Sequence, residues 1–265
     1  MRSMDATNPL KEALGRGEST IGIFVPMPSP EVVEVVALAG FDFVLLDGEH
    51  GRVSPDNAYP MILAAEARDV PVLARIGQND RQVILKFLDL GVRGVMIPQT
   101  TTPDEARAAV AAMRYQPRGV RGLAGGRTFD YGLGTAMAEL VPQINERVLS
   151  IVQFEHIDAL PHLEEMLTIP ELDVLFVGPT DLAQSLGYPG EPGHPEVEAI
   201  IATICATARD GRVALGTVAG DATATNRRLE QGFRMVVANV PTLLGRASRD
   251  LLAGVQRQGS KGRTG

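Results

Sequence analysis

Cysteine is nearly absent from this sequence of 265 residues. The single cysteine, Cys205, lies in an apolar run that the residue pattern predicts to be a buried helix, and one cysteine excludes a framework of internal disulfides. Tryptophan is missing, no apolar run is long enough to span a membrane, and the first residues contain no apolar signal core. The absence of a membrane-spanning run and of a signal core predicts a soluble protein of the cytoplasm, whereas the missing tryptophan decides nothing.

Basic residues are also scarce relative to acidic ones. The chain has 25 Lys and Arg against 32 Asp and Glu, a formal net charge of −7. Nucleic-acid and membrane-surface binders need basic patches, so this balance argues against both classes of partner. Small anionic substrates stay open, because they need only local positive charge. Apolar residues make up 45% of the chain, which is enough for a sizeable core.

Short apolar runs alternate with helical patterns along the whole chain. Eight runs are predicted to be strands, at residues 20–25, 41–46, 71–74, 94–97, 148–154, 173–177, 213–217 and 235–238. No linker or low-complexity stretch divides the chain. The pattern predicts an α/β fold, a (β/α)8 TIM barrel that residues 1–265 form as a single domain, with a flexible tail from about 257 to 265. A doubly wound sheet is the alternative, but no G-x-G-x-x-G motif follows the first strand.

Two of the predicted strands stop at a carboxylate. Glu155 follows the run LSIVQF, and Asp181 lies shortly after the run DVLFV. Neighbouring strand ends bring these two negative charges together, and they repel each other unless a cation lies between them. A divalent cation that takes oxygen ligands and keeps several waters is the natural candidate. Taken singly, Asp181 could instead be a helix N-cap and Glu155 a surface charge.

Further polar groups follow the ends of other predicted strands, where the active site of a barrel is built. They are Asp47, Glu49, His50, Arg75, Gln99 and Gln153. The seventh and eighth strands end in small or neutral groups instead. The charged groups therefore occupy one sector of the rim, which favours a catalytic site there.

This residue set suits chemistry on a 2-oxo acid. A metal chelates the carboxylate and the keto oxygen of such an acid, and Arg75 stabilises an enolate oxygen as charge develops on it. An imidazole is the side chain that ordinarily changes charge near neutral pH, so His50 is a candidate to move a proton directly or through a metal-bound water, and Asp47, three residues before it, is a candidate to orient it. Backbone N–H groups at the helix start beside Gly178 bind the substrate carboxylate. A structural ion pair for Arg75 and a structural role for His50 are the alternatives.

Lysine is absent from every predicted strand end, which disfavours Schiff-base chemistry and favours a metal-stabilised enolate. A long glycine-rich loop, residues 116–134, contains Arg118, Arg121 and Arg127. A loop of this length inside a compact domain is more often functional than idle. The remaining histidines are predicted to lie away from the charged rim and to have no role: His156, His162 and His194.

Several motifs taken together resemble a known family. LLDGEHG, LARIGQND, GVMIPQT, RGVRG, VQFE and FVGPTDLAQSLGYPG are similar to motifs of the class II pyruvate aldolases of the HpcH/HpaI family, over a stretch from about Gly22 to Arg249. The resemblance implies a (β/α)8 enzyme that needs Mg²⁺, Mn²⁺ or Co²⁺. Such an enzyme reversibly cleaves 4-hydroxy-2-oxo acids to an aldehyde and pyruvate or hydroxypyruvate. It also implies a homo-oligomer, hexameric or built from trimers, with C-terminal helices exchanged between subunits.

The resemblance assigns roles to the matching positions of this sequence. They are the metal ligands Glu155 and Asp181, the base His50, the enolate-stabilising Arg75, and the pyruvate contacts Gln153, Gly178 and Thr180. Asp89 is implied to raise the basicity of His50. The predicted topology places Asp89 at the C-terminal end of a helix, on the opposite face of the barrel. Its role therefore needs a neighbouring subunit or a bent helix.

Two other functions stay open at this point. A CoA-ester lyase of the malyl-CoA or citryl type would use the same barrel and metal carboxylates, but no extra basic segment is present to hold the CoA tail. A catalytically silent barrel would have no need of the whole charged set at the rim. Gln78 and the pair Gln99-Thr100 stand where relatives often have Trp and Met-Val. These departures make the rim more polar. The arginines of residues 119–127 suit an acidic or sugar-like acceptor aldehyde or, equally, a solvated surface, so the aldehyde stays unassigned.

Overall fold

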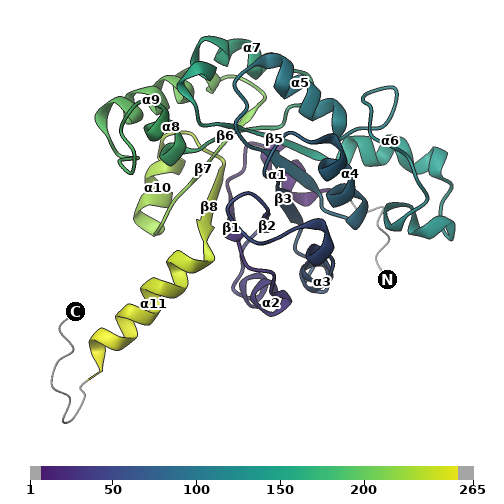
Figure 1. The fold of residues 1–265 in the computed structure, drawn as a ribbon, viewed down its shortest axis with the longest axis horizontal. Helices are drawn as coiled ribbons and strands as arrows, with labels where there is room; N and C mark the ends of the chain where they lie inside the picture. Colours follow the sequence, from purple (N-terminus) through teal and green to yellow (C-terminus); the bar gives the residue numbers. More distant parts are fainter. Residues whose placement is uncertain (1–6, 256–265) are drawn as a thin grey trace.

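The computed structural model describes residues 7–255 and contains a closed barrel of eight parallel strands in sequence order (Figure 1). The strands are β1 (Thr20–Val25), β2 (Phe43–Asp47), β3 (Val72–Arg75), β4 (Gly94–Ile97), β5 (Leu149–Phe154), β6 (Val174–Val177), β7 (Ala214–Val218) and β8 (Met235–Asn239). Strand β8 pairs with β1 and closes the barrel. The predicted single-domain (β/α)8 fold is confirmed.

Helices connect successive strands and cover the outside of the barrel, and one further helix precedes β1 and another follows β8 (Figure 1). They are α1 (Pro9–Gly15), α2 (Pro30–Leu38), α3 (Pro55–Glu66), α4 (Arg81–Leu90), α5 (Pro103–Ala112), η1 (Arg127–Gly132), α6 (Met137–Arg147), η2 (Ile157–His162), α7 (Leu163–Thr168), α8 (Pro179–Ser185), α9 (Pro195–Ala208), α10 (Ala222–Glu230) and α11 (Val240–Gly254). Many begin at a side chain that caps free N–H groups; Asp80, for example, accepts from Gln82 and Val83 at the start of α4.

The strands are apolar throughout because both of their faces are buried. One face packs against the surrounding helices, and the other fills the barrel interior with large side chains such as Phe43 and Phe176. Gly22 in β1 makes room for one of them, since a Cβ there would lie 2.1 Å from the Phe43 ring. The interior is therefore a packed core, and ligands are confined to the ends of the barrel.

Helix α1 closes the N-terminal end of the barrel. Its Leu10 and Leu14 belong to the interior apolar cluster. Asn8 Nδ2 donates to the backbone oxygens of Arg93 at 3.1 Å and Arg147 at 2.8 Å, just before β4 and β5. Lys11 Nζ donates to the Val148 oxygen at 2.9 Å. The opposite, C-terminal end of the barrel is left for a functional site.

Two predicted segments differ in detail from the structure. The helix expected to follow β5 is split into the 3-10 helix η2 and α7, because Pro161 has no N–H to continue a regular helix. The irregular loop at 116–134 contains the short helix η1. The tail predicted for residues 257–265 lies outside the described residues.

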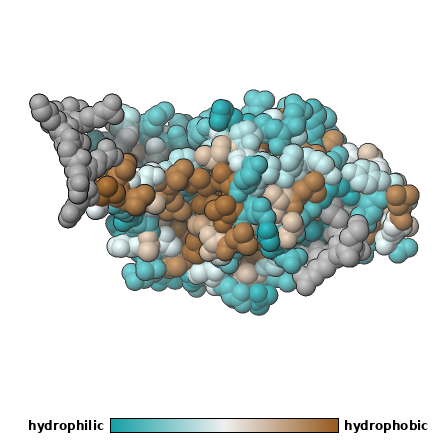
Figure 2. All heavy atoms as spheres, turned by 90° about the horizontal axis from the view of Figure 1, so that it is seen from below, coloured by the Kyte–Doolittle hydropathy of each residue, from teal (hydrophilic) through white to brown (hydrophobic). Residues whose placement is uncertain are grey.

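The last helix, α11, extends away from the barrel (Figure 1). Of its residues only Val240 is buried, while Leu244 and Leu251 are 63% and 70% exposed. Figure 2 shows the molecule of Figure 1 from below. Apolar side chains gather on this face, from the region beside the C-terminal helix to the middle of the molecule. Within residues 7–255, no helix combines the length and apolar character that a membrane crossing requires.

Candidate active site

Arg75 and Asp47 lie side by side at the C-terminal ends of β3 and β2, where the strand register pairs them. Arg75 Nε donates to Asp47 Oδ1 at 3.0 Å and Nη2 donates to Oδ2 at 2.7 Å, a bidentate ion pair. The guanidinium also lies over the Phe24 ring, 4.4 Å from its centroid. These contacts hold Arg75 in one orientation. The structural ion pair is thus present, and it leaves Nη1 directed elsewhere.

Glu49 is a site residue to which the sequence alone gave no role. Its side chain is buried, and Oε2 lies 3.2 Å from Arg75 Nη1 and 3.8 Å from His50 Nε2. The His50 side chain is 61% exposed beside it. Asp47 does not contact the imidazole. Instead its Oδ1 accepts the backbone N–H groups of Glu49 and His50, so Asp47 orients the turn that carries both side chains.

Glu155 follows β5 and is held by donors on both oxygens. The Gln99 N–H donates to Oε1 at 2.7 Å, and Gln153 Nε2 donates to Oε2 at 2.5 Å. Gln99 reaches this position with a φ of 50°, in the left-handed region that few residues other than glycine adopt. Gly178 leaves space for the carboxylate, because a Cβ there would lie 2.7 Å from Glu155 Oε2.

Asp181 lies in the first turn of α8, next to β6. It is not the N-cap, which is Gly178, and no side chain caps this helix. Gly178 was predicted to contact the substrate. Its N–H instead donates to the Phe154 oxygen at 3.1 Å and is therefore not available to a substrate carboxylate. The Thr180 and Asp181 N–H groups occupy the first-turn positions that have no partner within a helix. These two amides are therefore available to bind an anion at the start of the helix.

Electrostatics place Glu49, Glu155 and Asp181 near one another. Burial raises the pKa of Glu155 to about 7; the Gln99 N–H lowers it, and the charges of Glu49 and Asp181 raise it. Burial likewise raises the pKa of Glu49 to about 7, with Arg75 lowering it and Asp47 and Asp181 raising it. One guanidinium therefore faces several carboxylates that repel each other.

The donor set fits a divalent cation with few protein ligands. Glu49 Oε2 and Gln153 Oε1 are buried and have no hydrogen-bond partner in the described chain, although buried polar atoms are normally paired. Within that same part of the chain, no three His, Cys, Asp or Glu converge as a complete metal cage. Two carboxylates with the remaining positions left to water or substrate is the arrangement that Mg²⁺ commonly takes.

A cleft of about 560 Å³ opens beside these carboxylates. Its lining residues come from the loop after β4, the loop after β5 and helix α8: Gln99, Thr101, Glu155, His156, Asp158, Asp181, Gln184 and Ser185. The placement of His156 away from the charged rim was therefore wrong. His156 directly follows Glu155, and the chain turns there into η2, which brings the imidazole onto the cleft wall.

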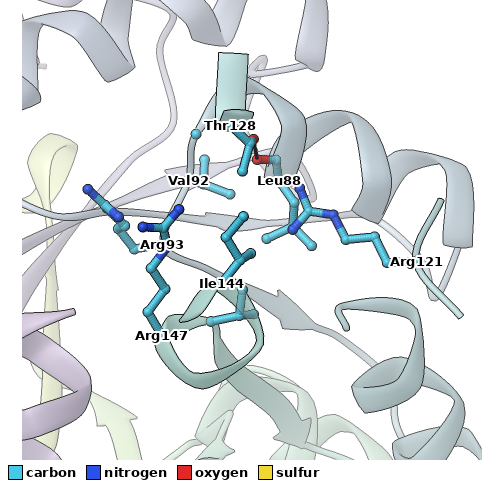
Figure 3. Close-up of a pocket in the computed structure, with 9 residues that line it drawn as sticks. Leu88, Val92, Arg93, Arg121, Thr128, Ile144 and Arg147 are labelled. Atoms are coloured by element: carbon cyan, nitrogen blue, oxygen red, sulfur yellow. Dashed lines mark hydrogen bonds between the residues drawn. The ribbon is translucent and has the colours of Figure 1, made fainter. Parts of the chain in front are cut away.

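Asp89 and the loop arginines lie at the other end of the barrel. Asp89 lies in the last turn of α4, and its Oδ1 accepts from Arg121 Nη2 at 2.8 Å. Figure 3 shows this region, where Arg93, Arg121 and Arg147 surround a small cavity next to the starts of β4 and β5. Within one chain, Asp89 is thus not brought to His50.

The other loop arginines also have partners inside the protein. Arg127 donates to Glu66 and, at 2.8 Å, to the Leu90 oxygen, and Arg118 pairs with Glu146 and Glu171. None of them lines the cleft. Within a single chain, the loop arginines are therefore not placed to contact an aldehyde in the cleft.

Comparisons with known proteins identify the family of this chain. The family model for HpcH/HpaI aldolase/citrate lyase matches residues 20–242. A hydroxypyruvate/pyruvate aldolase of Sagittula stellata is 39% identical over 234 residues, which cover 88% of this chain and 91% of that protein. A 2-keto-3-deoxy-L-rhamnonate aldolase of Escherichia coli O17:K52:H18 is 33% identical over 97% of this chain and 96% of its own length.

A solved structure extends the comparison to three dimensions. The crystal structure of an HpcH/HpaI aldolase/citrate lyase family protein from Burkholderia cenocepacia J2315 superposes with a TM-score of 0.88 and 32% identity, covering 93% of this chain and 98% of that one. The motifs, the barrel and the charged rim thus lead to one conclusion: this chain belongs to the HpcH/HpaI aldolase/citrate lyase family.

Proposed function

We propose that the chain is a class II aldolase, a carbon–carbon lyase that cleaves or forms 4-hydroxy-2-oxo acids. The fragments are an aldehyde and either pyruvate or hydroxypyruvate. The observation that carries this proposal is the fixed Arg75 guanidinium beside the buried carboxylates Glu49 and Glu155, at the C-terminal face of a barrel. The relatives named as aldolases support the same reaction class.

Glu155 and Asp181 would hold the divalent cation, Mg²⁺, Mn²⁺ or Co²⁺, on which this family in general depends. When bound, the cation supplies Lewis-acid polarisation of the 2-oxo group. The N–H groups of Thr180 and Asp181 bind the substrate carboxylate at the start of α8. Gln153 donates from Nε2 to Glu155 and so orients that carboxylate. Its Oε1 has no hydrogen-bond partner in the described chain, and Gln153 also contacts the 2-oxo acid.

In the cleavage direction His50 takes the proton of the 4-hydroxyl group. The C3–C4 bond then breaks, the aldehyde leaves, and the electron pair of that bond enters the remaining fragment as an enolate. Arg75 Nη1 is not used by Asp47, and it lies 3.2 Å from Glu49 Oε2 without hydrogen bonding to it. It donates to the enolate oxygen as negative charge develops there. The proton held by His50 returns to C3 and gives pyruvate.

The test is the release of pyruvate from a panel of 4-hydroxy-2-oxo acids, followed through lactate dehydrogenase. Release is expected with Mn²⁺ or Mg²⁺ and is expected to stop when EDTA removes the ion. Activity that survives complete chelation would overturn the class II assignment. Absence of release from the whole panel, with metal binding demonstrated, would favour the second candidate.

That second candidate is a CoA-ester lyase of the malyl-CoA or citryl type. It would need positive charge near the cleft for the phosphates of CoA. The lining residues include three carboxylates and no Lys or Arg. The cleft of this chain therefore supports the aldolase better.

Replacing His50 by Ala is expected to lower kcat for aldol cleavage by about 10²–10⁴, because a positioned base contributes that much to proton transfer. Mn²⁺ affinity should stay close to that of the unchanged protein, since His50 is not assigned as a ligand. Steady-state kinetics and calorimetric titration check the two parts. His162→Ala is the control. Normal turnover in the His50 variant would show that the base has been assigned wrongly.

Metal affinity is expected to rise with pH between about 6 and 8. With the pKa of Glu155 and of Glu49 raised to about 7, these carboxyls are partly protonated at neutral pH in the metal-free protein. A cation must displace those protons, so its binding at pH 7 should release about one proton. Calorimetry in two buffers of different ionisation enthalpy measures the release. Equal affinity at both ends of the range would contradict the raised pKa values.

We also propose that the chain is cytoplasmic and acts as a homo-oligomer in which α11 packs on a neighbouring copy. The exposed Leu244, Leu251 and Leu252 support this, since a helix with an apolar face is stable when that face is covered. A subunit arrangement of this kind would also be needed to bring Asp89 to His50. Sedimentation should give an assembly of three or six chains. A stable monomer at micromolar concentration would contradict it.

A further inference from the structure

The outer wall of the cleft presents neutral polar groups from three separate elements. Gln99 comes from the loop after β4, His156 from the loop after β5, and Gln184 from α8. The side chains of Gln99 and Gln184 are exposed and make no hydrogen bond to another residue of the described chain. The two free amide side chains and the exposed edge of the His156 imidazole face one space, and such groups are suited to hydrogen bonding a ligand.

His156 is the most directional of the three groups. Its Nδ1 accepts the backbone N–H of Asp158 at 3.2 Å, where the imidazole caps the start of η2. Nδ1 also lies 3.4 Å from Asp158 Oδ2, farther than the N–H that it accepts. With that N–H on Nδ1, we assign the proton of the neutral ring to Nε2, which is then a donor. The side chain is 47% exposed, which leaves Nε2–H accessible from the cleft.

The loop that carries His156 is held in place from α8. Ser185 Oγ accepts the N–H of Ile157 at 3.0 Å and donates to the Leu182 oxygen at 2.8 Å. Both bonds are internal, so Ser185 acts as a positioning residue. The wall formed by His156 and Gln184 is therefore built into the fold.

Charge on this wall is of one sign only. Glu155 and Asp181 are the carboxylates assigned to the cation, which would offset their charge, so Asp158 is the carboxylate that makes the outer wall negative, and none of the lining residues is a Lys or an Arg. A ligand group that carried a carboxylate here would be repelled, whereas hydroxyl groups would find both donors and acceptors. The wall thus discriminates by charge and by hydrogen bonding.

We propose that His156, with Gln99 and Gln184, binds the aldehyde half of the substrate and selects a neutral, hydroxylated aldehyde over one that ends in a carboxylate. This assignment rests on the proposed aldolase function and deepens it. His156 Nε2–H donates to a hydroxyl group of the aldehyde. Asp158 supplies the negative charge that disfavours an acidic aldehyde.

The test compares aldol addition of pyruvate to matched acceptors. D-glyceraldehyde and propanal share a three-carbon chain and differ in hydroxyl groups. Glycolaldehyde and glyoxylate differ in the terminal group, a hydroxyl against a carboxylate. Wild-type protein should prefer the hydroxylated member of each pair by kcat/KM. Propanal or glyoxylate used as well as its hydroxylated partner would overturn the inference.

Two substitutions of His156 separate its cap from its donor. His156→Asn keeps an acceptor near the Nδ1 position and lacks the Nε2–H, so the preference for glyceraldehyde over propanal should fall about tenfold, the loss of one good hydrogen bond. His156→Gln places a donor near the Nε2 position and should retain much of the preference. His162→Asn, in the same short helix, is the control and should leave the ratio unchanged. An unchanged ratio in His156→Asn would overturn the assignment.

Asp158→Asn tests the charge of the wall. Removing one carboxylate should raise kcat/KM for glyoxylate about fivefold relative to glycolaldehyde, as expected for one charge at contact distance in water. No change in that ratio would remove Asp158 from the proposal.

Exchange of the pyruvate methyl protons in D2O, measured without any aldehyde, distinguishes failure of the proposed aldolase function from failure of the aldehyde assignment. It reports enolate formation alone. If wild-type protein with metal shows no exchange, the aldolase function fails and the aldehyde assignment fails with it. If exchange occurs and the acceptor ratios do not respond to His156, only the aldehyde assignment is wrong.

Discussion

Replacing Glu155 by Gln is expected to weaken Mn²⁺ binding by about two orders of magnitude or more, and aldol cleavage should fall with it. The amide keeps the size of the side chain and an oxygen for the Gln99 N–H, but removes the negative charge that a hard cation requires. Calorimetric titration of the variant with Mn²⁺ measures the loss.

The same substitution is expected to stabilise the metal-free protein. Burial and the charges of Glu49 and Asp181 both disfavour an ionised Glu155, so a neutral amide is better tolerated there. A rotated Gln153 could then pair its unsatisfied Oε1 with the new NH2 group. A gain of about 1 kcal/mol corresponds to a rise in melting temperature of about 2–4 °C for a chain of this size.

The prediction is specific because Glu155→Gln should lower the affinity for Mn²⁺ and at the same time raise the melting temperature. A variant that merely unfolded would lose metal binding and melt earlier. Asp181→Asn is the matched comparison, because it removes a charge from the less buried member of the pair. It should lose metal binding as well, with a smaller gain in stability. Metal affinity that survived in both variants would show that the cation is held elsewhere.

Arg75→Lys is expected to lower kcat/KM for aldol cleavage by about 10²–10³, the usual cost of losing a positioned donor to a developing oxyanion. An ammonium group cannot bind Asp47 through two parallel hydrogen bonds and present a further N–H in a fixed direction. Its contact with the Phe24 ring would also be lost. Charge at the site is conserved, so the experiment isolates geometry.

The kinetic form of the loss distinguishes enolate stabilisation from simple substrate binding. A loss in kcat with little change in KM indicates an interaction made in the transition state, while a raised KM alone indicates uniform binding. Arg81→Lys, on the exposed start of α4, is the control. If Arg75→Lys turned over at the normal rate, the ion pair with Asp47 would be the only role of Arg75.

Much of the site could be predicted because the fold converts sequence order into position. Asp47, Arg75 and Gln153 stand at or near the last residue of an apolar strand, and parallel strands in a barrel end at the same face. The strands themselves are readable because burial on both faces removes polar residues from them. For these residues, knowing the strand end was enough to place the side chain.

Other site residues depend on backbone geometry that no residue pattern expresses. Glu49 lies in a turn, and its burial results from how Asp47 holds that turn through two N–H groups. Gln99 donates its backbone N–H to Glu155 from a left-handed conformation. A glutamine side chain in the sequence gives no indication of that backbone conformation. His156 reaches the cleft only because the chain bends into η2 directly after Glu155. The one available signal for His156 was its adjacency to a predicted ligand.

The loop arginines could not be interpreted because their partners are distant in sequence. Arg121 meets Asp89, 32 residues earlier, and Arg127 meets Glu66, 61 residues earlier. Both pairs join the loop to the N-terminal end of the barrel, where contacts support stability more than chemistry.

The first helix of the chain has a consequence for the order in which the protein folds. Asn8 and Lys11 bond to carbonyl groups that lie 85 to 139 residues further along the chain, so their acceptors exist only once β4 and β5 are in place. Contacts of such wide sequence separation form late, because a long loop must close first. Helix α1, which precedes every strand in the described chain, is therefore among the last elements to dock, and the N-terminal end of the barrel stays uncovered until it does.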